Sequence, residues 1–167
     1  KILMLTKIFL KIANKLPKKN HPFNLDKNWI LDLNYSEHEY KTASWLENLF
    51  TKWFDFNNLK DKTVLDIGCW WGGKWVYFAE KYNCKIIWID TELNFINQAK
   101  DIAKEKNVDN LCDFRLWNAL NLDIIDNSID FIILNDVIEH IPNTKIMFDE
   151  IYRVLKNWWQ VLFNFAP

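Results

Sequence analysis

Apolar residues recur with two different periods along most of this chain. Short apolar runs predict buried strands at residues 63–67, 85–89, 111–116, 129–134 and 161–165. Between them, apolar residues spaced three or four apart predict helices at residues 72–82, 92–106 and 144–156, the second with Phe95, Ala99, Ile102 and Ala103 inward. Strands that alternate with helices and are apolar on both faces indicate a parallel sheet covered on both sides.

The first part of the chain has a different, helical pattern. Residues 1–16 predict a helix with one apolar and one lysine-bearing face. Packing on its own domain is the favoured interpretation, and weak contact with a membrane surface is the alternative. Residues 17–35, which contain two prolines, predict a connector. A second helix is predicted from Ser36 to about Phe54, with Ser36 and Glu39 forming a capping box, and Asn57-Asn58 breaks the pattern.

Composition narrows the class of protein. The chain has 167 residues, half of them hydrophobic, which favours a single core. A net charge of −1 with interspersed signs gives no electrostatic argument for a nucleic-acid partner. No apolar run approaches the roughly 18 residues of a membrane span. Cys69, Cys84 and Cys112 are too scattered for a metal site or a disulfide framework, so a reduced, cytoplasmic setting is expected.

The loop after the first strand is the first candidate for binding chemistry. It reads Asp66-Ile-Gly-Cys-Trp-Trp-Gly-Gly73, and ligands of open α/β sheets bind at the carboxyl ends of strands. Glycines there allow a ligand to approach the backbone, and the following helix presents free N–H groups at its start. Asp90 ends the second strand, where a carboxylate can accept hydrogen bonds from both hydroxyls of a ribose. The alternative role for Asp90 is the N-cap of the next helix.

Five segments in this order resemble the motifs of class I S-adenosylmethionine (SAM)-dependent methyltransferases, chiefly the ubiquinone-type enzymes that act on small molecules. They are Val64-Leu-Asp-Ile-Gly-Cys69, Ile86-Ile-Trp-Ile-Asp90, Trp117-Asn-Ala119, Phe131-Ile-Ile-Leu-Asn-Asp-Val-Ile-Glu-His-Ile-Pro142 and Leu155-Lys-Asn-Trp-Trp-Gln-Val-Leu162. The resemblance implies a Rossmann-like α/β fold with five parallel strands present, helices on both faces and a helical N-terminal lead. It divides the chain into a lead or lid at residues 1–54 and a SAM-binding domain at 55–167 that is incomplete at its C-terminal end.

The resemblance also implies a function and a set of cofactor-binding residues. The methyl group of SAM would pass to a small-molecule or lipid-like acceptor, leaving S-adenosylhomocysteine (SAH). Asp66 would organise the loop and the cofactor's amino group, and Gly68, Trp70 and Gly72 would form the loop at the methionine end. Further contacts are assigned to Asp90 for the ribose, Thr91 or Leu93 and Asn118 with Ala119 for the adenine, and Asn135 beneath the methionine end.

No catalytic residue follows firmly, because methyl transfer from a sulfonium requires mainly alignment of the reactants. His140 is the candidate base, although packing in the turn is the favoured interpretation. Glu139 and Asp136 are weaker candidates. Tyr35, His38 and Tyr40 of the lead could reach cofactor or substrate, with helix packing favoured.

Tryptophan stands at several positions where the family usually has glycine. These positions are Trp70, Trp88, Trp117, Trp158 and Trp159, with Trp75 a sixth and Trp71 ambiguous. The chain has 10 tryptophans and 3 glycines, whereas average usage predicts roughly 12 glycines. Our hypothesis is that the codons at these positions, here translated as tryptophan, are a reassigned stop codon. The source organism would decode this codon as glycine. The gene decides this: ordinary tryptophan codons at positions 70 and 88 would exclude it.

Two other classes of function remain open at this stage. With glycine at position 70, residues 68–73 would match the Gly-x-Gly-x-x-Gly fingerprint of an NAD(P)-dependent oxidoreductase. Against this, Asp66 would face the incoming pyrophosphate. A catalytically inactive, methyltransferase-like scaffold would accommodate a bulky loop. The acceptor and the oligomeric state cannot be predicted from the sequence.

Overall fold

The elements of the computed structural model confirm the alternation of strands and helices. The structure describes residues 33–52 and 54–164. In chain order they form α2 (Leu33–Phe50), the 3-10 helix η2 (Phe56–Leu59), β1 (Thr63–Ile67), α3 (Gly73–Tyr82), β2 (Lys85–Asp90), α4 (Leu93–Glu105), η3 (Asp109–Leu111), β3 (Cys112–Leu116), β4 (Ile129–Asn135), η4 (Ile138–His140), α5 (Thr144–Val154) and β5 (Leu155–Asn164). The predicted helix at residues 1–16 and most of the predicted connector lie outside the described residues.

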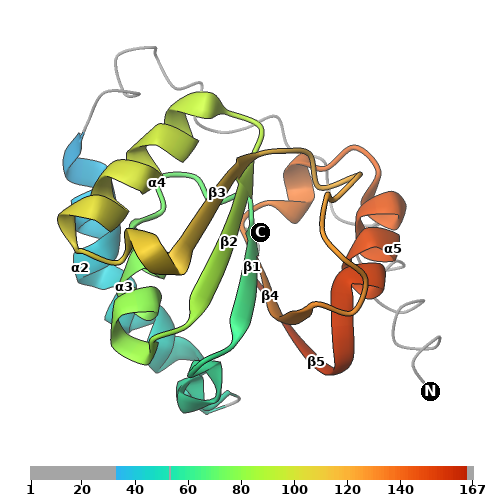
Figure 1. Cartoon of the computed structure of the whole chain (residues 1–167), viewed down its shortest axis with the longest axis horizontal. Helices are drawn as coiled ribbons and strands as arrows, with labels where there is room; N and C mark the ends of the chain where they lie inside the picture. Colours follow the sequence, from blue (N-terminus) through green and yellow to red (C-terminus); the bar gives the residue numbers. More distant parts are fainter. Residues whose placement is uncertain (1–32, 53, 165–167) are drawn as a thin grey trace.

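The five strands form one parallel sheet in the order β3-β2-β1-β4-β5 (Figure 1). β1 lies at its centre, with Asp66 beside Trp88 of β2 and Ile133 of β4. The chain reverses its direction of travel across the sheet between β3 and β4, so the loops that leave β1 and β4 diverge at the carboxyl edge. Ligands of such sheets bind at this switch point.

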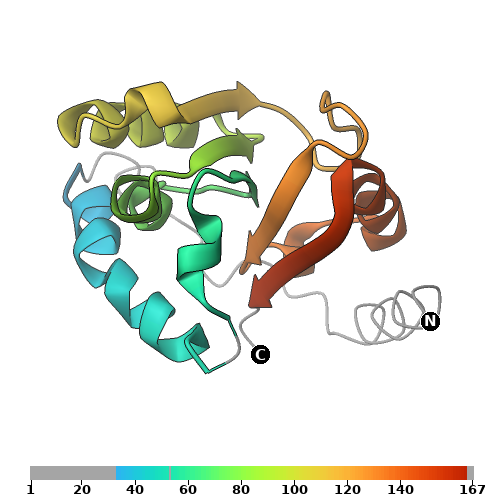
Figure 2. The ribbon, with the colours of Figure 1, turned by 60° about the horizontal axis from the view of Figure 1, so that its bottom comes forward.

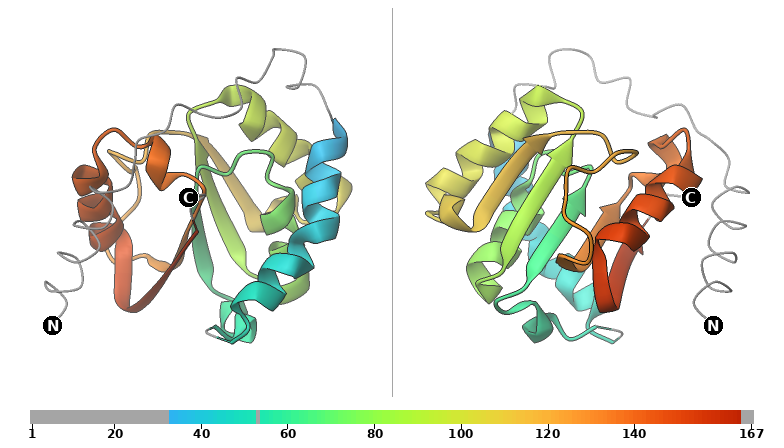
Figure 3. Two further views of the ribbon diagram at one scale, coloured as in Figure 1. Left: turned by 180° about the vertical axis from the view of Figure 1, so that it is seen from behind. Right: turned by 45° about the vertical axis from the view of Figure 1, so that its right-hand side comes forward.

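Helices cover both faces of the sheet and enclose two hydrophobic clusters. α2, α3 and α4 lie on one face, and α5 lies on the other (Figures 2 and 3). Phe78, Ile86 and Ala99 belong to the cluster beneath the first three helices, whereas Ile132 and Met147 belong to the cluster beneath α5. The predicted fold class, a Rossmann-like α/β fold with helices on both faces, is therefore confirmed.

Two element boundaries differ clearly from the sequence prediction. α2 begins at Leu33 and ends at Phe50, rather than running from Ser36 to about Phe54. β5 begins at Leu155, directly after α5, rather than at Val161. Its pairing with β4 is irregular between Ile129 and Phe131, which obscures the period of two in the sequence.

The amino edge of the sheet is joined by one acidic side chain. Asp130 of β4 accepts a hydrogen bond from the Thr63 backbone N–H of β1 at 3.0 Å and one from Lys156 Nζ of β5 at 2.8 Å, both through Oδ2. Three neighbouring strands thus meet at a single carboxylate, on the edge opposite to the divergent loops.

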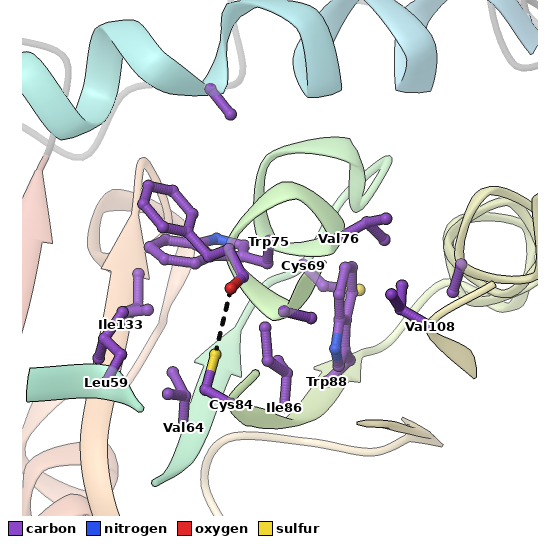
Figure 4. Packing of buried hydrophobic residues seen from close by; sticks show 14 of the residues in the cluster. Leu59, Val64, Cys69, Trp75, Val76, Cys84, Ile86, Trp88, Val108 and Ile133 are labelled. Carbon is purple, nitrogen blue, oxygen red and sulfur yellow. Dashed lines mark hydrogen bonds between the residues drawn. The ribbon is translucent and has the colours of Figure 1, made fainter. Parts of the chain in front are cut away.

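Two of the tryptophans at expected glycine positions are part of the core. Trp75 of α3 and Trp88 of β2 are buried in the first cluster (Figure 4). Trp75 packs on Phe78 and Trp88 on Phe114, with ring centroids 4.8 and 5.0 Å apart. Among the described residues, the Trp88 indole N–H has no hydrogen-bond partner. A buried unpaired donor costs about 1–3 kcal/mol, so Trp88 stabilises the core less than its size suggests.

Candidate cofactor site

A pocket of about 460 Å³ lies where the loops after β1, β2, β3 and β4 meet. Volumes of this order are typical of sites for small molecules. Its wall combines apolar side chains with a few polar groups. The lining residues are Ile67, Gly68, Trp70, Ile89, Asp90, Thr91, Glu92, Phe95, Trp117, Asn118, Ala119, Leu120, Asp136, Val137, His140, Ile141 and Pro142.

The backbone of the loop after β1 passes close to the loop after β4. Gly68 has φ +74°, and a Cβ at that residue would lie 2.5 Å from Cγ2 of Val137. A larger residue would therefore push the two loops apart. Gly68 thus allows both the turn and the close approach of the two loops at the pocket wall.

Asp90 lies at the centre of the polar part of the pocket. Its Oδ2 accepts a hydrogen bond from the Trp70 N–H at 3.1 Å, and its Oδ1 accepts one from the Glu92 N–H at 2.9 Å. Burial raises the pKa of Asp90, and the N–H groups of Glu92 and Trp70 oppose that rise. The N-cap residue of α4 is Glu92, so Asp90 makes a turn ahead of the helix rather than capping it.

Trp70 occupies part of the wall in a left-handed backbone conformation. Its φ is +48°, and its ring centroid lies 6.0 Å from that of Phe95. Left-handed φ costs a residue with a Cβ about 1–2 kcal/mol. The indole therefore adds bulk to the loop that the sequence assigned to the methionine end of a cofactor.

The loop after β3 forms another part of the wall. Asn118 Oδ1 accepts a hydrogen bond from the Leu120 N–H at 2.9 Å, which shapes the turn, and Ala119 is buried. The Trp117 indole N–H donates to the Asn121 carbonyl. Its partly exposed ring lines the pocket beside Asn118.

Not every predicted cofactor-binding residue lines the pocket. Gly68, Trp70, Asp90, Thr91, Asn118 and Ala119 do, whereas Asp66, Gly72, Leu93 and Asn135 do not. Leu93 is more than half exposed, and Asn135 Nδ2 donates to Asp136 Oδ2 at 3.0 Å. Phe95 was predicted only to face inward along its helix. It reaches the pocket because it lies at the start of α4, next to the loop.

His140 lies at the pocket and is exposed, whereas Glu139 of the same short helix does not line it. Asp136 lines the pocket beside His140. In α2, Tyr35 packs on Trp71 with ring centroids 5.5 Å apart, and Tyr40 packs on Tyr77 at 5.9 Å. The Tyr40 contact agrees with the helix-packing interpretation, whereas Tyr35 packs on the loop after β1. His38 is exposed, and its ring lies 5.9 Å from that of Tyr35.

The predicted capping box in α2 is wrong. Ser36 and Glu39 lie inside the helix and bond to the loop instead: Ser36 Oγ donates to the Trp71 carbonyl at 2.9 Å, and Glu39 Oε2 accepts from the Gly73 N–H at 3.2 Å. A Cβ at Gly73 would lie 1.9 Å from the Ser36 carbonyl oxygen, so glycine is required for this approach. The N–H at the start of α3, which the sequence predicts to be free, is thereby occupied.

Asp66 is buried beneath the loop, and its Oδ2 has no hydrogen-bond partner among the described residues. Burial raises the pKa of Asp66 well above its usual range, and nearby Glu39 adds to this rise. Because the folded state holds the proton more tightly, Asp66 stabilises the fold below its unfolded pKa, and that stability is lost as the pH rises through the raised value.

We therefore expect Asp66→Asn to raise the melting temperature by several degrees at neutral pH, and to have little effect near pH 4. Thermal unfolding followed by circular dichroism from pH 4 to 8 measures this. Asp101→Asn, at an exposed position of α4, is the matched control. A melting temperature of Asp66→Asn that runs parallel to that of the unaltered chain across this range would contradict the assignment.

A sequence model of the family described as "Methyltransferase domain" matches residues 65–158, which is more than half of the chain. The chain belongs to the methyltransferase domain family. Norajmaline N-methyltransferase of Rauvolfia serpentina is 30% identical over 105 residues, which cover 63% of this chain and 36% of that enzyme. Phosphoethanolamine N-methyltransferase 2 of Caenorhabditis elegans is 33% identical over 101 residues, with coverages of 60% and 23%. The chain thus spans only about a quarter to a third of these relatives.

Solved structures confirm the fold of this methyltransferase domain. A Methanococcus maripaludis protein, described as a candidate S-adenosyl-L-methionine-dependent methyltransferase, superimposes with a TM-score of 0.72 at 19% identity, over 90% of this chain and 68% of that one. Geranyl diphosphate methyltransferase in complex with SAM superimposes with a TM-score of 0.62 at 18% identity, with coverages of 84% and 55%. The described residues contain no helix long and apolar enough to span a membrane and no cluster suited to a metal ion.

Proposed function

We propose that this chain carries the SAM-binding part of a methyltransferase that acts on a small-molecule or lipid-like acceptor. The pocket at the carboxyl edge of the sheet carries the proposal, because it brings Gly68, Asp90, Asn118 and Ala119 together from three separate loops. Family membership supports this reading. Relatives named for N-methylation of norajmaline and of phosphoethanolamine support a small acceptor.

The residues present fit the adenosine end of SAM and crowd its methionine end. Asp90 offers carboxylate lone pairs for ribose hydroxyls, and Asn118 with Ala119 offers a turn beside the adenine. The indole of Trp70 narrows the space beside Gly68. When bound, SAM supplies a methyl group on a good leaving group, so the protein's contribution is to align the acceptor and exclude water.

His140 is the residue we assign to proton handling when the acceptor must lose a proton. It lines the pocket and is exposed, so its imidazole can exchange protons with solvent. Asp136 lines the same pocket and can orient an incoming amine or hydroxyl. The acceptor itself would enter from this side of the pocket.

Calorimetric titration with SAH and with NADH tests the proposal. We expect heat of binding with SAH and none with NADH, most clearly in a Trp70→Gly variant. Binding of NADH alone would overturn the proposal in favour of an oxidoreductase. Binding of neither ligand by either protein would favour the scaffold interpretation.

A further inference from the structure

The start of the helix after β1 is the place where a parallel α/β fold normally receives an anion. Free N–H groups and the helix dipole favour a phosphate there, and dinucleotide-binding folds use this position for the pyrophosphate. In this chain a carboxylate of the protein takes the position. Glu39 of α2 accepts the Gly73 N–H through Oε2, and its Oε1 lies 3.5 Å from Lys74 Nζ.

Four other N–H groups of the loop are also used within the protein. Those of Gly68 and Cys69 donate to the Ile89 carbonyl, that of Gly72 donates to the Cys69 carbonyl, and that of Trp70 donates to Asp90. Together with Gly73, five N–H groups between residues 68 and 73 have acceptors before any ligand arrives. A phosphate could bind them only by displacing these acceptors.

The acidic groups around the loop outnumber the basic ones. Buried Glu39 and Asp66 interact electrostatically, Asp90 contributes a further carboxyl, and Lys74 is the cation that acts on both Glu39 and Asp66. The Asp66 Oδ2 atom is buried and has no hydrogen-bond partner among the described residues. Burial raises the pKa of all three carboxyls, so an incoming anion would oppose their ionisation further and an incoming cation would favour it.

We propose that Glu39 is a specificity-determining residue, which occupies the anion site at the start of α3 and so selects a cationic sulfonium cofactor over an anionic diphosphate ligand. Glu39 precedes Gly73 by 34 residues in the sequence, so a segment outside the loop supplies the residue that selects the ligand. α2 is well placed to do so, since it packs along α3 beside the sheet (Figure 3). The part of this inference that concerns SAM rests on the proposed function, whereas the part that concerns a diphosphate ligand does not.

Titration of the full chain with ADP is the decisive experiment. Glu39→Ala removes the carboxylate and frees the Gly73 N–H, whereas Glu39→Gln keeps an acceptor oxygen and removes only the charge. We expect Glu39→Ala to bind ADP about tenfold more tightly than the unaltered chain, with Glu39→Gln intermediate. Glu37→Gln, on the same helix but paired with Lys41 and Lys106, is the matched control and should leave ADP affinity unchanged.

The second readout compares SAM with SAH, which lacks the methyl group and the positive charge on sulfur. In the Trp70→Gly background, Glu39→Gln should weaken SAM several-fold more than SAH, because a change in loop shape alone would weaken both equally. Circular dichroism at the titration temperature confirms that each variant is folded. ADP affinity that does not rise in either folded Glu39 variant would overturn the inference. Failure of SAM and SAH to bind any variant would instead overturn the proposed function.

Discussion

Trp70→Gly is expected to bind SAH at least about tenfold more tightly than the unaltered chain. The indole takes up space in the pocket wall, and the φ of +48° at residue 70 is one that glycine adopts without strain, so the loop should keep its shape in the variant. A tenfold gain in affinity corresponds to about 1.4 kcal/mol. Removing the indole also widens the pocket beside Gly68 and Phe95. The unaltered chain should therefore bind SAM and SAH weakly. Isothermal titration of both proteins measures the difference.

Trp45→Ala separates this effect from the loss of any tryptophan. Trp45 is 63% exposed on α2 and does not line the pocket, so its replacement should leave SAH affinity unchanged. Equal SAH affinities of Trp70→Gly and the unaltered chain would show that the indole does not obstruct the cofactor. Tight binding of SAH by the unaltered chain would likewise contradict the physical argument for glycine at residue 70 in the native protein.

Asp90→Ala is expected to reduce SAH affinity about a hundredfold in the Trp70→Gly background. Hydrogen bonds to a charged group contribute about 1.5–3 kcal/mol each, and a ribose offers two hydroxyls to this carboxylate. Asp90 also holds the Trp70 and Glu92 N–H groups, so part of the loss could arise from a disturbed loop. A second titration is therefore needed, with two ligands that differ only in a ribose hydroxyl, to isolate the contribution of the ribose to affinity.

Adenosine and 2′-deoxyadenosine provide that pair. The Trp70→Gly protein should bind adenosine more tightly than 2′-deoxyadenosine, and Asp90→Ala in that background should bind both equally. If Asp90 has a purely structural role, Asp90→Ala should instead weaken the binding of both nucleosides by the same factor. Asp101→Ala, at an exposed position of α4, serves as the charge control. A preference for adenosine that survives in Asp90→Ala would exclude Asp90 as the ribose ligand.

The sequence predicted β1, β2 and β4 well because each of these strands is a mostly apolar run bounded by residues that break it. β1 begins at Thr63 and ends at Ile67, as its pattern indicates. The start of β5 was placed too late, because α5 ends at Val154 and the strand begins at the next residue, Leu155. Polar residues at the start of the strand, Lys156, Asn157 and Gln160, resemble a loop in the sequence.

The role of α2 could not be predicted for a different reason. Ser36 and Glu39 have the spacing of a capping box, and this local pattern does not reveal whether the side chains bond to their own helix. In the fold they bond to residues 71 and 73, more than thirty positions away. The same side chains thus serve a tertiary contact that only the three-dimensional arrangement reveals.

Asp130 links three strands of the sheet by hydrogen bonds at the edge remote from the pocket. Because its bonds to Thr63 and Lys156 lie at the amino edge, changes there should alter folding without reshaping the pocket. The loops at the opposite edge can then differ in conformation without loss of the stability of the sheet. In this chain the residues that link the strands at the amino edge and the residues that line the pocket are thus separate sets.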